Sequence, residues 1–512
     1  MNNIGSLFNA HFILPELLIT VTCLMIALCG RFSKFRNSLW LGYSAIFSLL
    51  CAGIILWVFG YGQGYSDIIF NDPFAVFCKT VVLIGATLGL IPSVPSIAKR
   101  YGHRQGDYYA LLLLMVLGTL LVCSANELVM IYLGLELIFI PLYIISAYFH
   151  TNDFAIASSS SCGRGRELLL TGVFSSALFA YGLSLLYGLS GTTNLVQAKI
   201  NMAMTQVSFN GEFSPVLLAA SLLIGAGLLI KLFLPLLSLA REEMFSSFPS
   251  ELRSIYQTSI ATAVLAGFIK IFMNTLFAFS DPVMAPNDWG TTLGLLAAVA
   301  ILYSTVGLFS HRDLPTTIYH LWIIQIGICL AGTLSLSAAG MTSIGFTLII
   351  QTLPFLGALA ITGFLRQKQE LGSSVTISGL YHDSPSATIS LIIFLLAMIG
   401  VPPTAGFISR FDLLQEGFRI AASDGRFAWL YLLYAVIILS SFFGLLAVIR
   451  IIRSFFVKRP DFVSAPFQHR PSLALQCVML VCASSLILFG VYPAPLVAFV
   501  ANLPSVFGFP VK

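Results

Sequence analysis

Apolar runs of about 18–25 residues recur along almost the whole chain, separated by short segments that are polar or rich in Gly and Pro. A helix of about 20 apolar residues crosses the hydrocarbon core of a bilayer. Helices are expected because a spanning segment must satisfy its own backbone polar groups. We therefore predict an all-α polytopic membrane protein with about fourteen transmembrane helices. They are placed near residues 10–30, 38–60, 73–96, 107–124, 127–149, 167–190, 214–240, 255–278, 289–310, 314–337, 342–365, 386–409, 427–456 and 473–502.

The composition excludes several classes of protein. Of the 512 residues, 58% are hydrophobic and 9% are charged, against about 25% charged in an ordinary soluble domain. The net charge of +5 is not gathered into a basic surface, so no nucleic acid partner is expected. The nine cysteines lie mostly inside apolar runs without a CxxC pair, and no phosphate-binding loop is present. We expect neither a metal nor a nucleotide cofactor on this chain.

The loops carry information about domains and orientation. Gaps such as Tyr61–Asp72 and Gly191–Phe213 are predicted to be polar loops, too short for a second domain. Eighteen of the 26 basic residues fall in loops that follow odd-numbered predicted helices. The positive-inside rule then places both termini on the outer side of the membrane. The first residues show no charged region or cleavage site, so no cleaved targeting segment is expected.

The predicted seventh helix contains a lysine and a proline. Lys231 lies within the apolar run Leu217–Leu239, four residues before Pro235. A cation at the centre of a membrane helix costs at least about 2.5–3.5 kcal/mol, so it normally has a polar partner. Proline lacks an N–H and breaks or kinks the helix. This run is therefore predicted to be a broken helix with a titratable amine, unless the lysine lies near a helix end and extends to the headgroups.

The predicted fifth helix carries two glutamates. Glu127 lies at its entrance and Glu136 close to its middle, with Tyr132 and Tyr143 near the same helical face. A carboxylate near the membrane midplane is by default part of an ion or proton path. The alternative is a protonated glutamate that is hydrogen-bonded inside the bundle.

A second interruption lies in the predicted twelfth helix. Pro402 and Pro403 interrupt an apolar run, and Arg410 follows one to two turns later. Irregular helices at corresponding places in two halves indicate an inverted-repeat transporter. Because helices 7 and 12 are five apart, we predict two inverted five-helix repeats, each with one broken helix. The single membrane domain of residues 1–512 would then comprise helices 1–3 over 1–106, the first repeat over 107–280, the second repeat over 289–456 and a last helix over 457–512.

Four stretches together resemble a known family. They are NELVMIYLGLELIFIPLYIISAY, FSSALFAYGLSLLYGLSGTTNL, GLLIKLFLPL and GVPPTAGFISRF. This combination resembles the antiporter-like subunits of respiratory complex I, the proton-pumping NADH:quinone oxidoreductase, and among them most of all subunit 2, called subunit N in bacteria. The resemblance covers the predicted helices four to thirteen.

The resemblance implies a proton-translocating subunit of the complex I membrane arm, with no redox cofactor of its own. NADH, FMN, iron–sulfur clusters and quinone would be bound by other subunits. The implied partners are antiporter-like subunit 4, small membrane subunits and membrane lipids, cardiolipin among them. The implied location is the mitochondrial inner membrane, with a bacterial cytoplasmic membrane as the alternative and a thylakoid membrane less favoured.

The resemblance also assigns roles to residues. Glu136 matches the family's helix-five glutamate, which pairs with the helix-seven lysine, matched by Lys231. Arg410 stands where the family usually has a lysine that connects the path to one side of the membrane. Glu167 replaces the usual lysine of helix six, and the usual lysine early in helix eight has no match, although Lys270 lies further along that helix.

The hypothesis for the mechanism is that Lys231 changes protonation as Glu136 approaches and separates. The alternatives are a subunit of a sodium/proton antiporter, a subunit of a membrane-bound hydrogenase or formate-linked complex, and a structural subunit of the complex I arm that does not pump.

Overall fold

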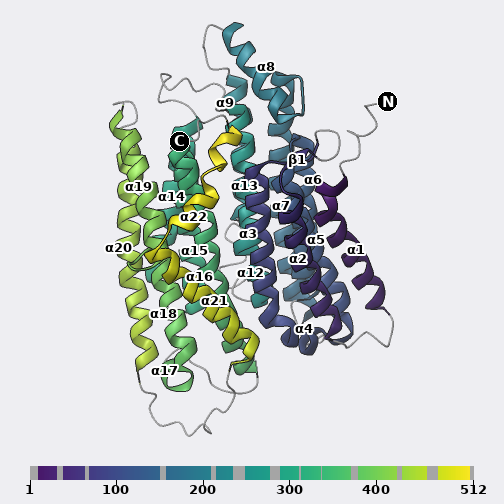
Figure 1. Ribbon diagram of the computed structural model, residues 1–512, viewed down its shortest axis with the longest axis vertical. Helices are drawn as coiled ribbons and strands as arrows, with labels where there is room; N and C mark the ends of the chain where they lie inside the picture. Colours follow the sequence, from purple (N-terminus) through teal and green to yellow (C-terminus); the bar gives the residue numbers. More distant parts are fainter. Residues whose placement is uncertain are drawn as a thin grey trace. The chain divides into compact units, whose positions relative to one another are not determined.

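The computed structural model of the chain is a set of packed α-helices (Figure 1). The structure describes residues 10–31, 39–63, 68–149, 157–208, 215–233, 248–276, 289–310, 313–335, 337–370, 379–423, 429–457 and 471–507. Within these residues the one sheet is a short antiparallel pair, β1 (Gly62–Gln63) and β2 (Phe70–Asn71).

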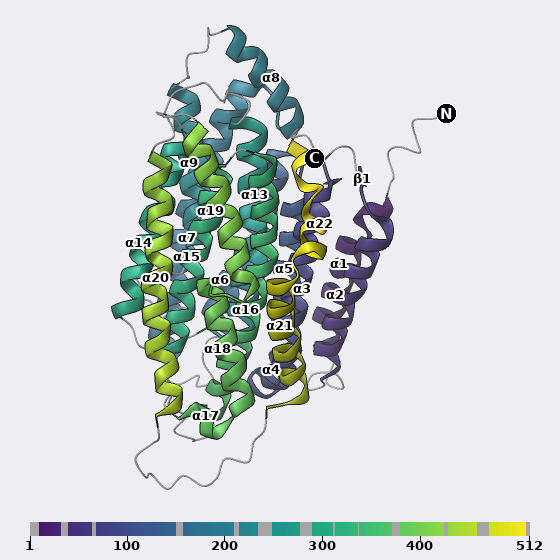
Figure 2. The same cartoon turned by 60° about the vertical axis from the view of Figure 1, so that its left-hand side comes forward.

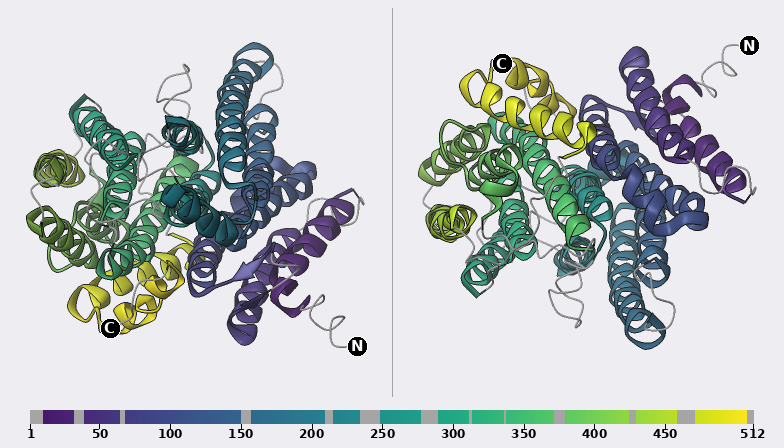
Figure 3. Two further views of the ribbon diagram at one scale, coloured as in Figure 1. Left: turned by 90° about the horizontal axis from the view of Figure 1, so that it is seen from above. Right: turned by 90° about the horizontal axis from the view of Figure 1, so that it is seen from below.

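The helices pack into two compact units. The first unit comprises Met1–Thr87, Val94–Phe248 and Ser259–Trp289. The second comprises Leu88–Ser93, Pro249–Thr258 and Gly290–Lys512. In Figure 3 many helices of each unit are seen nearly along their axes, which is the arrangement of a helix bundle.

In the first unit, α5 packs between α1 and α6, and α7 packs between α6 and α9. Helix α13 contacts α5, α6 and α9, so it lies inside this bundle. The helices of this unit are η1 (Ala10–Ile13), α1 (Leu14–Cys29), α2 (Trp40–Phe59), α3 (Pro73–Leu90), α4 (Val94–Tyr101), η3 (Gly102–Arg104), α5 (Gln105–Ser124), α6 (Leu128–Tyr148), α7 (Ala157–Ser190), α8 (Leu195–Ser208), α9 (Pro215–Leu232), α13 (Ala261–Ile271) and η5 (Phe272–Leu276).

In the second unit, α16 is the central helix, because it contacts α12, α15, α18, α19, α21 and α22. Figure 2 shows α19 continuing beyond α18 in the same bundle. The helices that lie wholly or partly in this unit are η2 (Ile91–Ser93), α12 (Ser250–Ile255), η4 (Tyr256–Ile260), α14 (Trp289–Ser310), α15 (Leu314–Thr333), α16 (Ala338–Glu370), α17 (Leu380–Asp383), α18 (Pro385–Ile399), α19 (Ala405–Ser423), α20 (Trp429–Phe456), α21 (Leu473–Val491), α22 (Ala494–Val500) and η8 (Leu503–Phe507).

The all-α polytopic membrane fold is confirmed. The described residues contain 12 helical runs long and apolar enough to cross a membrane. Large apolar side chains are exposed on the outer helices, for example Phe47 (68%), Leu432 (74%) and Leu480 (68%). Soluble monomers rarely expose so much apolar surface, which is the usual character of a surface that faces lipid or other membrane subunits.

Two places explain why this number is lower than the predicted fourteen. Pro73–Ser124 counts as a single 52-residue run, although it contains the two predicted helices now seen as α3 and α5. The predicted twelfth helix is divided into the shorter helices α18 and α19. The prediction of a loop over Gly191–Phe213 was wrong, because α8 forms within it. Helix α8 is short and its apolar residues are interspersed with polar ones, so a hydropathy window does not detect it.

The predicted break in the twelfth helix is confirmed. Helix α18 ends at Ile399, and α19 begins at Ala405 after a turn that contains Pro402 and Pro403. Gly400, with φ of 83°, caps α18 in the left-handed conformation that glycine adopts most readily. The other predicted break, at Pro235, lies outside the described residues. The division into repeats over 107–280 and 289–456 stays a prediction.

The helix with Lys270 contains two irregular turns that the sequence analysis did not anticipate. Both η4 and η5 are π-helical turns, which flank α13 on either side. Such turns are rare and occur frequently at functional sites. Lys270 lies in the last turn of α13, directly before η5.

Helices α7 and α9 approach each other closely through glycine. A Cβ atom at Gly227 of α9 would lie 2.7 Å from Cβ of Phe179 and 2.9 Å from its backbone. At Gly225, two residues earlier, the nearest atom is Cζ of Phe272 at 3.6 Å. Glycine at position 227 therefore sets the spacing between α7 and α9.

We predict that Gly227→Ala destabilises the protein by about 1–3 kcal/mol, the usual cost of overpacking, because α7 and α9 must separate. Gly225→Ala is the matched control on the same helix, and it should leave stability unchanged or raise it slightly. Thermal unfolding of both purified variants in detergent measures the difference. Equal unfolding temperatures for the two variants would contradict this account of the packing.

Candidate functional site: a buried ion pair and an arginine at a helix break

Lys231 and Glu136 form an ion pair inside the first unit. Nζ of Lys231, on α9, lies 3.0 Å from Oε1 of Glu136, on α6. The lysine side chain is fully buried, and the glutamate side chain is 22% exposed. The sequence analysis singled out both residues separately, and the fold brings them together across 95 positions of the chain.

A third helix completes this site. Nζ of Lys231 donates a hydrogen bond to Oγ of Ser176, on α7, at 2.8 Å. The same hydroxyl donates to Oε1 of Glu136 at 2.6 Å. Nζ of Lys231 also lies 4.7 Å from the ring centroid of Phe139, close enough for a cation–π contact. The ammonium is therefore surrounded by one charge, one hydroxyl and one aromatic face.

Helix geometry supports the position of Lys231. Lys231 lies in the last turn of α9, where the helix dipole favours a cation. Glu136 lies five residues before Pro141, which is inside α6. Because proline has no N–H, the carbonyl of Leu137 has no partner in the helical hydrogen-bond pattern. The sequence analysis missed Pro141 and gave no role to Ser176.

Arg410 lies in the second unit, at the break between α18 and α19. Its guanidinium donates to Oγ of Ser441 at 2.6 Å, to Oε1 of Gln325 at 3.2 Å and to the carbonyl of Met398. The break supplies the last of these acceptors. In a continuous helix the carbonyl of Met398 would accept from the amide of residue 402, but Pro402 has no N–H, so this carbonyl is left for the arginine. The described residues that accept these bonds from Arg410 are neutral.

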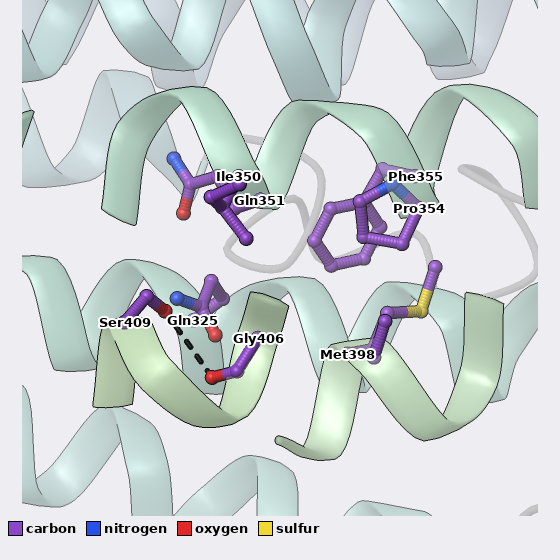
Figure 4. A pocket seen from close by; sticks show the side chains of 9 residues that line it. Gln325, Ile350, Gln351, Pro354, Phe355, Met398, Gly406 and Ser409 are labelled. Atoms are coloured by element: carbon purple, nitrogen blue, oxygen red, sulfur yellow. Dashed lines mark hydrogen bonds between the residues drawn. The ribbon is translucent and has the colours of Figure 1, made fainter. Parts of the chain in front are cut away.

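A small cavity lies beside Arg410. Figure 4 shows Gln325 of α15, Gln351 and Pro354 of α16, Met398 of α18 and Ser409 of α19 at its wall. The cavity has a volume of about 10 Å³, which is about the minimum that can hold one water molecule. Pro354 lies inside α16 and frees the carbonyl of Ile350, which also lines the cavity. Residues of four helices thus meet at this point.

The other predicted residues take separate places in the first unit. Lys270 lies 3.5 Å from Oδ2 of Asp72, and so pairs with a carboxylate that the sequence analysis did not consider. Glu127 precedes α6, and its backbone pairs with Asn194. Oε2 of Glu167, on α7, is buried without a hydrogen-bond partner among the described residues. None of the three appears in the hydrogen bonds that join Glu136, Ser176 and Lys231.

The family follows from the segment that holds these residues. Residues 125–423, more than half of the chain, match the model of the NADH:quinone oxidoreductase/Mrp antiporter transmembrane family. The chain belongs to this family. The matched segment contains Glu136, Lys231, Lys270 and Arg410, so each of these predicted site residues lies within the family's common core.

Curated relatives of the family extend the likeness to almost the whole chain. NADH-quinone oxidoreductase subunit N of Trichlorobacter lovleyi is 29% identical over 442 residues, which cover 84% of this chain and 85% of that protein. The subunit N of Moorella thermoacetica is 28% identical over 508 residues, and this match covers 98% of this chain and 100% of that protein. The recognition of an antiporter-like subunit of the subunit N type is thereby confirmed.

Solved structures of the family share the fold. A chain of the Mrp complex from Dietzia sp. DQ12-45-1b superposes with a TM-score of 0.79 at 16% identity, covering 98% of each chain. A chain of respiratory complex I from Thermus thermophilus superposes with a TM-score of 0.71 at 18% identity, covering 95% of this chain and 99% of that one. Identities this low establish the common fold and leave the activity to be argued from the site.

We predict that Arg410→Met destabilises the protein by at least about 1–3 kcal/mol, the cost of one buried polar group left without a partner. The carbonyl of Met398 and Oε1 of Gln325 would both lose a donor. Gln415→Met, on the same helix, changes an exposed side chain and should change stability little. Denaturant unfolding measures the free energy of unfolding of each variant. An equal loss of stability in the two variants would contradict the assigned role of Arg410.

Proposed function

We propose that this chain is a proton-translocating membrane-arm subunit of an NADH:quinone oxidoreductase, and that protons move by way of Lys231. The observation that carries the proposal is the buried Lys231–Glu136 ion pair at 3.0 Å within the family's common segment. The curated relatives named subunit N support the choice of complex, since they match over most of their length.

The geometry provides a way to load and release a proton. With Glu136 at 3.0 Å, the ammonium form of the fully buried Lys231 side chain is stabilised by an opposite charge. If Glu136 moves away, the opposite charge is lost, while the hydroxyl of Ser176 and the ring of Phe139 stay beside the amine. Breaking a buried pair costs about 3–5 kcal/mol, which is enough to favour the neutral amine and release of the proton. Movement of Glu136 thus couples a conformational change to protonation.

Arg410 has a different role in the proposal. A guanidinium does not readily lose its proton, so it supplies a permanent positive charge. Held by three neutral oxygens at the helix break, it orients the polar groups of Gln325 and Ser441 beside the cavity. We assign Arg410 to positioning of the path in the second unit, while Lys231 carries the exchangeable proton.

The rest of the assembly belongs to the same proposal. Other subunits would bind NADH, FMN, iron–sulfur clusters and quinone, so that electron transfer takes place away from this chain. Antiporter-like subunit 4, small membrane subunits and lipids such as cardiolipin would be its neighbours. The membrane would be the mitochondrial inner membrane or a bacterial cytoplasmic membrane, with both termini outside, and the bacterial origin of the subunit N relatives favours the second.

A sodium/proton antiporter subunit is the second candidate, because the Mrp complex from Dietzia has a chain of the same fold. Membrane vesicles that contain this chain without quinone reductase activity separate the two functions. Sodium-driven proton exchange in such vesicles would favour the antiporter. Its absence there, together with NADH-driven pumping by vesicles that contain the assembled complex, would favour the oxidoreductase.

We predict that Lys231→Met lowers the number of protons pumped per electron in the assembled complex, because the exchangeable amine is removed. Lys199→Met, on α8 outside the ion pair, is the control and should pump as the wild type does. The assay measures NADH-driven acidification of proteoliposomes together with the rate of NADH oxidation. An unchanged ratio of protons to electrons in Lys231→Met would show that the proposed path is wrong.

A further inference from the structure

A second group of buried charges lies in the first unit, apart from Glu136 and Lys231. It consists of Glu16 on α1, Asp72 directly before α3, Lys79 on α3 and Lys270 on α13, and is called here the N-terminal charge cluster. The side chains of Lys79 and Glu16 are 0% and 3% exposed, and those of Lys270 and Asp72 are 4% and 8% exposed. Two of the four come from helices that precede the family's common segment.

Two ion pairs, joined through the neighbouring residues Asn71 and Asp72, connect the four residues into one group. Nζ of Lys79 donates to Oε1 of Glu16 and, at 2.6 Å, to Oδ1 of Asn71. The next residue, Asp72, lies 3.5 Å from Nζ of Lys270. Nζ of Lys270 also donates to the carbonyl of Ala125 at 3.3 Å. The chain segment Asn71–Asp72 therefore links a tight pair with a looser one.

The cluster is not fully satisfied. Oε2 of Glu16 is buried and has no hydrogen-bond partner in the part of the chain that the structure describes. A buried carboxylate oxygen without a donor is costly, and a proton on that oxygen removes the charge that makes it so. Buried ion pairs seldom raise stability, and ionisable groups inside a membrane are by default functional. Both points favour a site that binds a proton over a purely structural bridge.

Few other titratable groups of the described chain face the cluster. The thiols of Cys78 and Cys123 are buried next to each other, and Cys78 lies within the electrostatic reach of Lys270 and Asp72. His11 lies on η1, beside Phe12, whose carbonyl accepts a hydrogen bond from Asn71 at 2.9 Å. Histidine is the side chain best suited to pass protons near neutral pH.

The cluster is separate from the Lys231–Glu136 pair. The side chain of Phe272, two residues after Lys270, packs toward Gly225 of α9. Gly225 lies six residues before Lys231, which is about 9 Å along a helix axis. The two sites therefore lie at different depths of one bundle, with the cluster nearer the ends at which α1 and α3 begin.

We propose that the N-terminal charge cluster is a second proton-binding site, which exchanges one proton with the aqueous phase at the end of the bundle where α1 and α3 begin. A proton from hydronium forms an O–H bond at Oε2 of Glu16, and the cluster changes from net charge zero to +1. Release to water reverses the step, while Lys79 and Lys270 keep their protons. This inference rests on the proposed function, since it adds a terminal site to the same proton path.

The test uses the assembled complex in proteoliposomes. Glu16→Gln removes the carboxylate and keeps a side chain of equal size with an acceptor for Lys79. We expect this variant to pump fewer protons per electron and to lose a carboxylic-acid carbonyl band from the infrared difference spectrum recorded on acidification. Asp107 is an exposed residue at the start of α5, and Asp107→Asn is the matched control. This variant should keep both the wild-type number of protons per electron and the carboxylic-acid band.

The outcomes separate this inference from the proposed function. If Glu16→Gln keeps both the band and the ratio while Lys231→Met lowers the ratio, the cluster is not a proton site and the proposed function stands. A lower ratio without loss of a carboxyl band would assign the cluster a structural role and overturn the inference. If Lys231→Met also pumps normally, the proposed function fails, and the inference with it.

A second variant covers the case in which Glu16→Gln does not assemble. Asp72→Asn removes the other carboxylate and keeps an oxygen that can accept from the amide of Ala75, as Oδ1 of Asp72 does. We expect fewer protons per electron in this variant as well. A wild-type ratio in an assembled Asp72→Asn complex would overturn the inference.

Discussion

A positive charge inside a membrane needs a partner, and much of the first unit is arranged to give Lys231 one. The ammonium has no solvent contact, so it depends on Glu136 from α6, Ser176 from α7 and the ring of Phe139. These groups meet only because glycine at position 227 lets α7 approach α9 closely. The close contact between α7 and α9 therefore both packs the helices and places Ser176 beside Lys231.

The second unit solves a similar problem differently. Arg410 is held by neutral oxygens, one of which is a carbonyl made available by the break between α18 and α19. A guanidinium bound in this way keeps its charge, whereas an amine paired with a movable carboxylate can change protonation. Glu136–Lys231 is thus suited to proton exchange and Arg410 to orientation of polar groups.

The sequence allowed the all-α membrane fold and the principal charges to be predicted, because isolated charges and prolines stand out within long apolar runs. Side chains that complete the site, such as Ser176 and Gln325, were missed, since a serine or glutamine is ordinary in such a run and gains meaning only from its neighbours in space. The helix α8 was missed because it is not apolar enough. The π-helical turns beside Lys270 leave no periodicity that a sequence window detects.

The central claim is that Lys231 exchanges a proton and is not merely a fixed charge. The most direct test is the proton-to-electron ratio of a Lys231→Arg complex, in which the positive charge beside Glu136 is kept but cannot readily be released. The account predicts that this complex assembles and oxidises NADH but pumps fewer protons per electron. A wild-type ratio would contradict the account, because a permanent charge would then be sufficient at this position.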